Sequence, residues 1–173
     1  MAIRWVQFPL HPDTPAAGLA LADLFRGRDL TGMHRQMQAR MQAAGLEYAD
    51  RSMTYNSRLA QELAKWAETR AGGSAIHNAL FRAYFVYNHN LADIDVLLGV
   101  AAAVGLDGAE ARAVLEQRSF RAQVDADWSY SHKLGITGVP SFVSQNQVVV
   151  GSQPYEVLEK FVQHLRGNSN DRR

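Results

Sequence analysis

The sequence predicts an α/β fold in which a large helical block separates two short β-type regions. Residues 3–8 form a short apolar and aromatic run that prolines end, which is typical of a strand. From residue 31 to residue 166 the apolar positions recur mostly at helical spacing. Near the end of the chain, Ser141–Ser144 and residues 148–150 are β-type runs. Because Asn146 between them tolerates a positive φ, they predict a hairpin.

Capping residues divide the helical block into separate helices. Thr14 and Pro15 predict the start of a first short helix over residues 18–26. Either Asp93 or the nearby Asn90 is expected to cap the helix that follows, and Asp107 predicts an acidic cap, which suits the positive end of a helix dipole. Glycines mark several of the other ends. The expected helices cover residues 31–44, 56–70, 74–87, 93–104, 107–117, 119–134 and 154–165.

Composition narrows the classes of function. The 173 residues are 47% hydrophobic and 20% charged, which is ordinary for one globular domain. Eighteen Lys and Arg against 17 Asp and Glu give a charge of +1, so no basic field indicates nucleic acid as a partner. The longest apolar run, near residues 96–104, is far shorter than the roughly 20 residues that cross a bilayer. Residues 1–5 lack the features of a secretory signal, so we expect a cytoplasmic protein with no membrane partner.

The sequence contains no cysteine. This excludes a disulfide, a thiolate nucleophile, a sulfur-ligated zinc ion and a Cys-x-x-Cys pair within these residues, and we predict no catalytic residue. The histidines are not spaced as ligand pairs on a helix, so no metal site is expected. They are His11, His34, His77, His89, His132 and His164.

Three methionines form a stripe along one predicted helix. Met33, Met37 and Met41 share a face at i, i+4 and i+8. Such a stripe belongs more often to a hydrophobic core, and the alternative is a groove for unfolded peptide, because methionine adapts to varied partners. Trp66 and Trp128 are expected to be core aromatics.

Five stretches together resemble one family. They are WVQFPLHPDTP (5–15), MTYNSRLA (53–60), FRAYF (81–85), GITGVPSF (135–142) and VVGSQPY (149–155). In this order they are similar to the DsbA/FrnE-type thioredoxin-fold oxidoreductases, with hydroxychromene-carboxylate isomerases and kappa-class glutathione transferases as relatives. The resemblance implies an incomplete thioredoxin-like fold with a large inserted helical domain. Residues 1–30 and 119–166 would form the thioredoxin-like half, 31–118 the insertion and 167–173 a flexible tail.

The resemblance also implies a missing piece. Family members begin with a strand and a helix that carries the Cys-x-x-Cys motif, and this sequence matches the family only after that helix. The missing strand would lie between residues 3–8 and Ser141–Ser144. Those two segments could pair directly, a second copy could complete the sheet, or the chain is truncated. We favour truncation combined with self-association, and therefore expect a homo-oligomer.

The family's substrate site predicts which residues bind a ligand. The family's cis-proline loop corresponds to Val139 and Pro140, where the backbone would meet an extended peptide or glutathione. In the glutathione-dependent relatives, the turn equivalent to Gly151, Ser152 and Gln153 holds the γ-glutamyl end of glutathione. The favoured alternative for Ser152 is a cap of the terminal helix.

The resemblance therefore implies thiol–disulfide oxidoreduction as the family activity. This chain cannot perform it, because it has no cysteine thiol. We predict a redox-inactive member that keeps the cis-proline dock and has no bound cofactor. His11 would flank the site. The alternatives are a glutathione-binding isomerase or transferase relative, and a non-enzymatic binding or oligomerising remnant.

Overall fold

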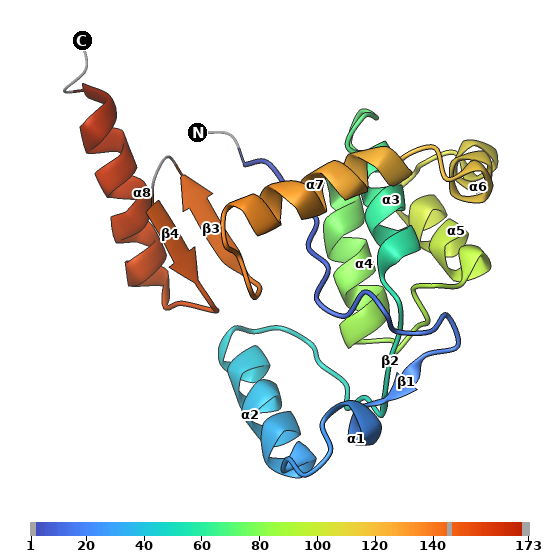
Figure 1. The fold of residues 1–173 in the computed structure, drawn as a ribbon, viewed down its shortest axis with the longest axis horizontal. Helices are drawn as coiled ribbons and strands as arrows, with labels where there is room; N and C mark the ends of the chain where they lie inside the picture. The colour runs from blue at the N-terminus through green and yellow to red at the C-terminus, as the bar shows by residue number, and fades with distance from the viewer. Residues whose placement is uncertain (1–2, 145–146, 171–173) are drawn as a thin grey trace. The chain divides into compact units, whose positions relative to one another are not determined.

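The computed structural model describes residues 3–144 and 147–170 (Figure 1). The predicted turn at Asn146 lies outside the described residues. In chain order the elements are β1 (Leu19–Ala20), α1 (Leu21–Leu24), α2 (Leu30–Ala43), β2 (Met53–Thr54), α3 (Arg58–Ala67), α4 (Ala75–Phe85), α5 (Ile94–Ala103), α6 (Gly108–Gln117), α7 (Arg121–Lys133), β3 (Ser141–Ser144), β4 (Gln147–Val150) and α8 (Tyr155–Asn170). The helices from α2 onward fall within a few residues of the predicted ranges, apart from the end of α8.

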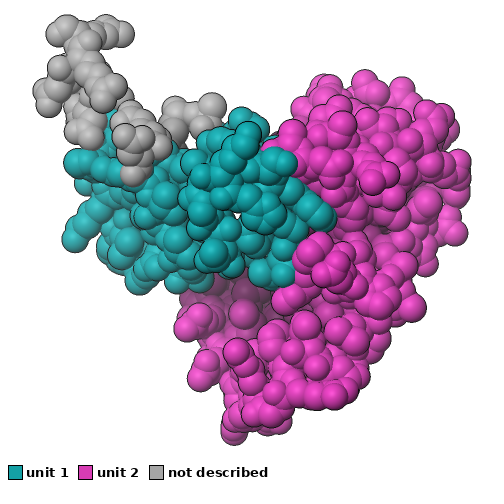
Figure 2. Space-filling model, in the orientation of Figure 1, with its two compact units in different colours: residues 1–10, 127–173 teal, residues 11–126 magenta. Residues whose placement is uncertain are grey.

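The chain forms two compact units, coloured separately in Figure 2. Unit 1 comprises Met1–Leu10 and Asp127–Arg173, and unit 2 comprises His11–Ala126. The resemblance predicts a different division, in which the inserted domain begins after residue 30 and ends at residue 118. The difference has a local reason, because Asn56 donates hydrogen bonds to the carbonyls of Pro12 and Thr14 and so ties the early segment to unit 2.

The core of unit 2 lies among α3, α4, α5 and α6. Its fully buried large side chains include the predicted core aromatic Trp66, and they come from all four helices. Burial of apolar area of this kind is the main stabilising contribution to a helical bundle. These large side chains are Leu63, Trp66, Ile76, Leu97 and Leu115.

Local sequence signals set the ends of the central helices. The Asp93 carboxylate accepts a hydrogen bond from the N–H of Asp95 at 2.8 Å, and Asp107 accepts one from Glu110 at 2.7 Å. Both predicted caps are confirmed. Beyond α5, Gly105 takes a φ of +76°, a conformation that glycine adopts without the steric penalty of a side chain.

The predicted strand over residues 3–8 is wrong. These residues have no regular secondary structure, and β3 pairs with β4 alone among the described strands. A strand needs a neighbouring ladder for its backbone groups. Here the N–H of Gln7 instead donates to the carboxylate of Asp127 at 3.0 Å. The direct pairing of residues 3–8 with Ser141–Ser144 is therefore also wrong.

Two other helix predictions need correction. The helix expected over residues 18–26 is confined to Leu21–Leu24, because Leu19–Ala20 pairs as β1 with β2. The terminal helix, expected to end at residue 165, continues as α8 to Asn170, and the flexible tail expected over residues 167–173 stays a prediction.

The methionine stripe does not belong to a core. Met33 and Met37 are 37% and 41% exposed, and α2 has no buried residue. Sequence spacing predicts that the side chains share a helix face, but only packing decides whether another element covers it.

Candidate functional site

The loop after α7 carries the predicted substrate-binding residues. Gly135 ends the helix with a φ of +67°, and its N–H donates to the carbonyl of His132. Two residues before the proline, the carbonyl of Gly138 accepts a hydrogen bond from the hydroxyl of Ser141 at 2.7 Å. The Val139–Pro140 peptide bond is cis. The loop is thus tied to the start of β3.

The second predicted segment, Gly151–Gln153, lies against this loop. β3 and β4 pair antiparallel, with Ser141 opposite Val150. One residue further, the N–H of Gly151 donates to the carbonyl of Pro140 at 2.7 Å. Both predicted binding segments therefore meet at one end of the hairpin.

The register shows which backbone groups of β3 face outward. Hydrogen-bonded and non-bonded pairs alternate along an antiparallel ladder. Because Pro140 and Gly151 form a bonded pair, Phe142 and Ser144 also direct their backbone groups at β4. Ser141 and Val143 direct theirs at the opposite edge, which no other described strand occupies. We call this edge, with Val139 at its start, the outer edge of β3.

Val139 extends the outer edge into the loop. Its N–H and C=O make no hydrogen bond to the described residues, and its side chain is 49% exposed. Phe142 and Val143 are exposed to a similar degree. An unpaired strand edge flanked by apolar side chains can pair with another extended segment.

The turn after β4 is held by its own residues. Gly151 has a φ of +86°, and the side-chain amide of Gln153 donates to the carbonyl of Val150 at 2.7 Å. Ser152 is exposed, and its hydroxyl makes no hydrogen bond to the described residues. The helix-cap interpretation of Ser152 is therefore wrong, since Pro154 accepts the first hydrogen bonds of α8.

His11 is not part of this loop and hairpin. It belongs to unit 2, where its carbonyl accepts a hydrogen bond from Thr14. Its flanking role stays a prediction.

Among the described residues no group of three or more His, Cys, Asp or Glu side chains could hold a metal ion. The described helices also include none that is long and apolar enough to span a membrane.

Sequence reasoning missed a buried ionic cluster in unit 2. Glu62 is fully buried and accepts hydrogen bonds from Arg58 at 2.8 Å and from Arg118 at 2.8 and 2.6 Å. Arg58 also binds Asp125 at 2.6 Å. Burial by itself would raise the pKa of the Glu62 carboxyl, but the hydrogen bonds from the two arginines outweigh it and leave the pKa below its ordinary value. The i, i+4 spacing of Arg58 and Glu62 was a local signal, whereas Arg118 is distant in sequence.

A second pair, His77 and Glu68, is partly buried in the same unit. The ring nitrogen Nε2 of His77 lies 3.0 Å from a carboxylate oxygen of Glu68. Burial lowers the pKa of His77 below its ordinary value, although Glu68 acts in the opposite direction. The pair joins α4 to the end of α3 and offers no ligand set for a metal.

Comparison with known proteins identifies relatives along nearly the whole chain. A family model of the DSBA-like thioredoxin domain matches residues 1–163. The uncharacterized protein YwbO of Bacillus subtilis is 34% identical over 91 residues, which are 52% of this chain and 46% of that protein. The match thus covers less than half the length of this curated relative.

Solved structures share the fold. A probable DsbA oxidoreductase from Streptomyces coelicolor matches with a TM-score of 0.87 and 28% identity, over 94% of this chain and 74% of that chain. A 2-hydroxychromene-2-carboxylate isomerase matches with a TM-score of 0.76 and 18% identity, over 98% and 84%. The cytosolic disulfide reductase DsbM from Pseudomonas aeruginosa, solved with glutathione, matches with a TM-score of 0.58 and 24% identity, over 80% and 78%. The last two likenesses concern the fold alone.

Proposed function

Because this chain belongs to the DSBA-like thioredoxin domain family, we propose that it binds extended polypeptide along the outer edge of β3 and contributes no thiol chemistry of its own. The observation that carries the proposal is the row of unpaired backbone groups at Val139, Ser141 and Val143. An extended peptide adds to such an edge through main-chain hydrogen bonds, and pockets for alternate side chains give specificity.

The lack of cysteine sets the limit of this function. Dithiol–disulfide exchange proceeds by attack of a thiolate and passes through a mixed disulfide. The 173 residues contain no cysteine, so they supply neither the attacking sulfur nor a resolving one. We therefore expect the purified chain to give no turnover in an insulin reduction assay. Turnover would contradict the proposal.

The side chains beside the edge favour an apolar peptide. Val139, Phe142 and Val143 are each more than a third exposed. The neighbouring polar groups, Ser141 and Ser144, are uncharged, so the edge itself has no charged side chain to select a charged partner. We expect the chain to bind unfolded segments in which apolar and polar residues alternate.

A proline scan along the hairpin tests the edge directly. The N–H of Val143 points outward, so Val143→Pro removes one donor of the outer edge and leaves the bonds to β4 in place. Val148→Pro is the matched control, because Val148 faces Val143 in the register and directs its N–H away from β3. Fluorescence anisotropy with a labelled, cysteine-free extended peptide should show binding weakened about tenfold by the first substitution and little changed by the second.

Two outcomes would overturn the edge as the dock. One is equal binding by the Val143→Pro variant and the unchanged protein. The other is an equal loss in the Val148→Pro control. If Val143→Pro fails to fold, as judged by circular dichroism, a peptide N-methylated at every residue replaces it. Such a peptide cannot donate to the edge and should not bind the unchanged protein.

The same edge should also support self-association. Without peptide, the outer edge of β3 is open to the edge of a second copy. We expect an oligomer in sizing experiments that dissociates on dilution and on addition of peptide. A monomer at high concentration would contradict this part of the proposal.

The cytoplasmic location expected from the sequence agrees with the described compartment of DsbM, and cell fractionation tests it.

Glutathione is a second candidate ligand. DsbM, which shares the fold, was solved with glutathione, and the turn at Gly151–Gln153 is bonded to the Val139–Pro140 loop. The exposed hydroxyl of Ser152 and the remaining amide oxygen of Gln153 are polar groups that could meet the γ-glutamyl end. Calorimetric titration of the unchanged protein and of Ser152→Ala tests this. No binding at millimolar glutathione would remove this candidate.

A further inference from the structure

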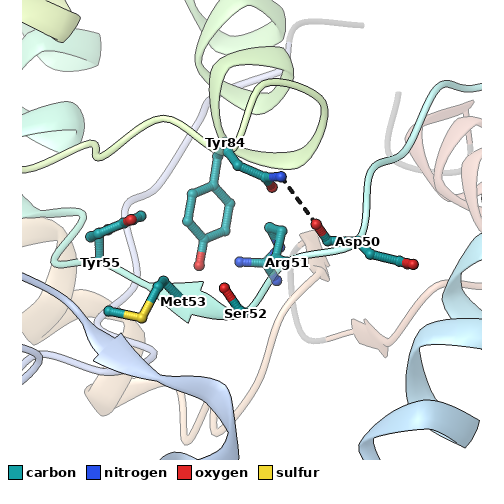
Figure 3. A pocket seen from close by; sticks show the side chains of 7 residues that line it. Asp50, Arg51, Ser52, Met53, Tyr55 and Tyr84 are labelled. Atoms are coloured by element: carbon teal, nitrogen blue, oxygen red, sulfur yellow. Dashed lines mark hydrogen bonds between the residues drawn. The ribbon is translucent and has the colours of Figure 1, made fainter.

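Unit 2 contains a cavity beside β2 that the proposed dock does not use. It has a volume of about 80 Å³ and lies where the chain enters β2, next to the end of α4 (Figure 3). Arg51 and Ser52 come from the segment before β2, and Tyr84 comes from α4. Its volume admits a few water molecules or one small ion.

Aromatic rings hold the guanidinium of Arg51 in place. Its Cζ atom lies 4.2 Å from the ring centroid of Tyr84 and 5.0 Å from that of Phe85. These two rings pack edge to face, with their centroids 4.9 Å apart. The hydroxyl of Tyr84 pairs with Thr54 of β2 at 2.8 Å, which fixes the ring. The guanidinium is therefore positioned before any ligand binds, by cation–π contacts.

This guanidinium has no acceptor among the described residues. Nε and Nη1 of Arg51 are buried without a hydrogen-bond partner. The remaining nitrogen, Nη2, makes no hydrogen bond to the described residues and is not among the buried atoms, so it is at least partly exposed, and Arg51 is one of the residues that line the cavity. A buried guanidinium without an acceptor is costly, and a carboxylate or phosphate oxygen is the acceptor that would compensate it most.

Other arginines of the unit show what is missing at Arg51. Arg70 and Arg112 are exposed and Arg82 is half-buried, as Arg51 is, and each of these three pairs with a carboxylate. Asp50 is the only acidic residue that lines the cavity, and its carboxylate points away from the guanidinium in Figure 3. Asn88 binds the backbone carbonyl of Asp50 at 3.0 Å rather than the carboxylate.

Hydroxyl groups complete the lining. Ser52 and Tyr55 both line the cavity, and their hydroxyls make no hydrogen bond to the described residues. Ser52 directly follows Arg51 in the chain, and both residues line the cavity. A fixed cation together with neutral hydroxyl donors is a combination that binds a negatively charged oxygen group.

We propose that this cavity binds a small oxyanion, with Arg51 as its anchor. The ligand class is a carboxylate or an inorganic phosphate-sized group, because a cavity of about 80 Å³ has no room for a nucleotide. The oxyanion accepts from Nη2 of Arg51 and from the hydroxyl of Ser52. No bond is made or broken.

Calorimetric titrations with inorganic phosphate, sulfate and acetate, at ionic strength held constant with sodium chloride, test the site. Arg51→Gln should weaken binding at least about tenfold, because it removes the charge and the fork of donors. Arg35→Gln is the matched control, since Arg35 is exposed on α2 and is not among the residues that line this cavity. It should change binding less than about twofold. Tighter binding of phosphate would indicate a phosphate group as the natural ligand, and tighter binding of acetate would indicate a carboxylate.

Three results would overturn the site: no saturable binding by the unchanged protein, equal binding after Arg51→Gln, or an equal loss in Arg35→Gln. If Arg51→Gln does not fold, the unchanged protein still decides the question by nuclear magnetic resonance. Phosphate or acetate should then shift the side-chain Nε–H resonance of Arg51 in a saturable way and leave that of Arg35 unchanged. A saturable shift would support the site, and an unshifted Arg51 signal would exclude it.

Discussion

Unit 2 buries its large side chains and pairs its buried carboxylate, whereas the hairpin of unit 1 leaves one strand edge and several apolar side chains exposed. Leu63 and Trp66 are almost fully buried in unit 2. In unit 1, Phe142 and Val150 are 39% and 55% exposed. Stability therefore resides mainly in the helical core, while the surface available for a partner lies on the hairpin.

This difference bears on how the family fold is used. The buried carboxylate of Glu62 in unit 2 has its partners, Arg58 and Arg118, within the unit. The backbone groups on the outer edge of β3 have none among the described residues. A region whose groups are paired internally maintains the scaffold, and a region with unpaired groups can exchange water for a ligand.

Truncating one apolar side chain in each unit should give the largest contrast. Leu63→Ala removes a fully buried side chain and should lower the free energy of unfolding by about 3 kcal/mol, because a cavity remains. Phe142→Ala on the hairpin should lower it by less than about 1 kcal/mol. Chemical denaturation followed by circular dichroism measures both. Similar losses would show that the hairpin has a core of its own.

Neutralising the buried carboxylate should have the next largest effect. Glu62→Gln leaves Arg118 without its carboxylate partner and leaves Arg58 with Asp125 alone, and it should destabilise the protein by about 3 kcal/mol. Glu116→Gln is the control, because its ion pair with Arg112 is exposed and should contribute little to the free energy of unfolding. The comparison between the units would fail if both variants lost the same small amount.

Removing a helix cap should have a moderate effect. Asp107→Ala deletes the acceptor for the N–H of Glu110 and should lower the free energy of unfolding by about 1 kcal/mol. Asp107→Asn, which keeps an acceptor oxygen, should recover most of this loss. Thermal unfolding of the three proteins measures it. An equal loss in both variants would mean that charge, rather than the hydrogen bond, is the stabilising feature.

Acid should produce the smallest change within the range where the protein stays folded. The pKa of Glu62 is lower in the folded chain than in the unfolded chain. Between those two values the unfolded chain binds more protons, so stability falls as the pH falls. The unfolding midpoints of the unchanged protein and of Glu62→Gln should therefore differ most at pH 7. The difference between the two midpoints should begin to decrease below about pH 4.5. A constant difference down to acid pH would contradict this.

Much of the candidate site could be predicted from the sequence. The Val139–Pro140 loop and the Gly151–Gln153 turn were placed by resemblance, and the structure joins them through the bond between Pro140 and Gly151. Arg51 gave no signal, because its cavity depends on Tyr84 and Phe85, which lie more than thirty residues further along the chain. Arg118 was missed in the same way as a partner of Glu62.

By itself, the sequence determined the positions of the helices from α2 to α7, two of their caps and the two strands of the hairpin. Periodicity, the carboxylates of Asp93 and Asp107, and the glycine after α5 act over a few residues, so they are visible in one dimension. Only the tertiary structure decided that residues 3–8 form no strand, that the face of α2 with Met37 is exposed, and which edge of β3 is open. The physical reason is that a strand, a buried face and an ion pair each need a partner from elsewhere in the chain. The local sequence does not specify which distant residues will be that partner.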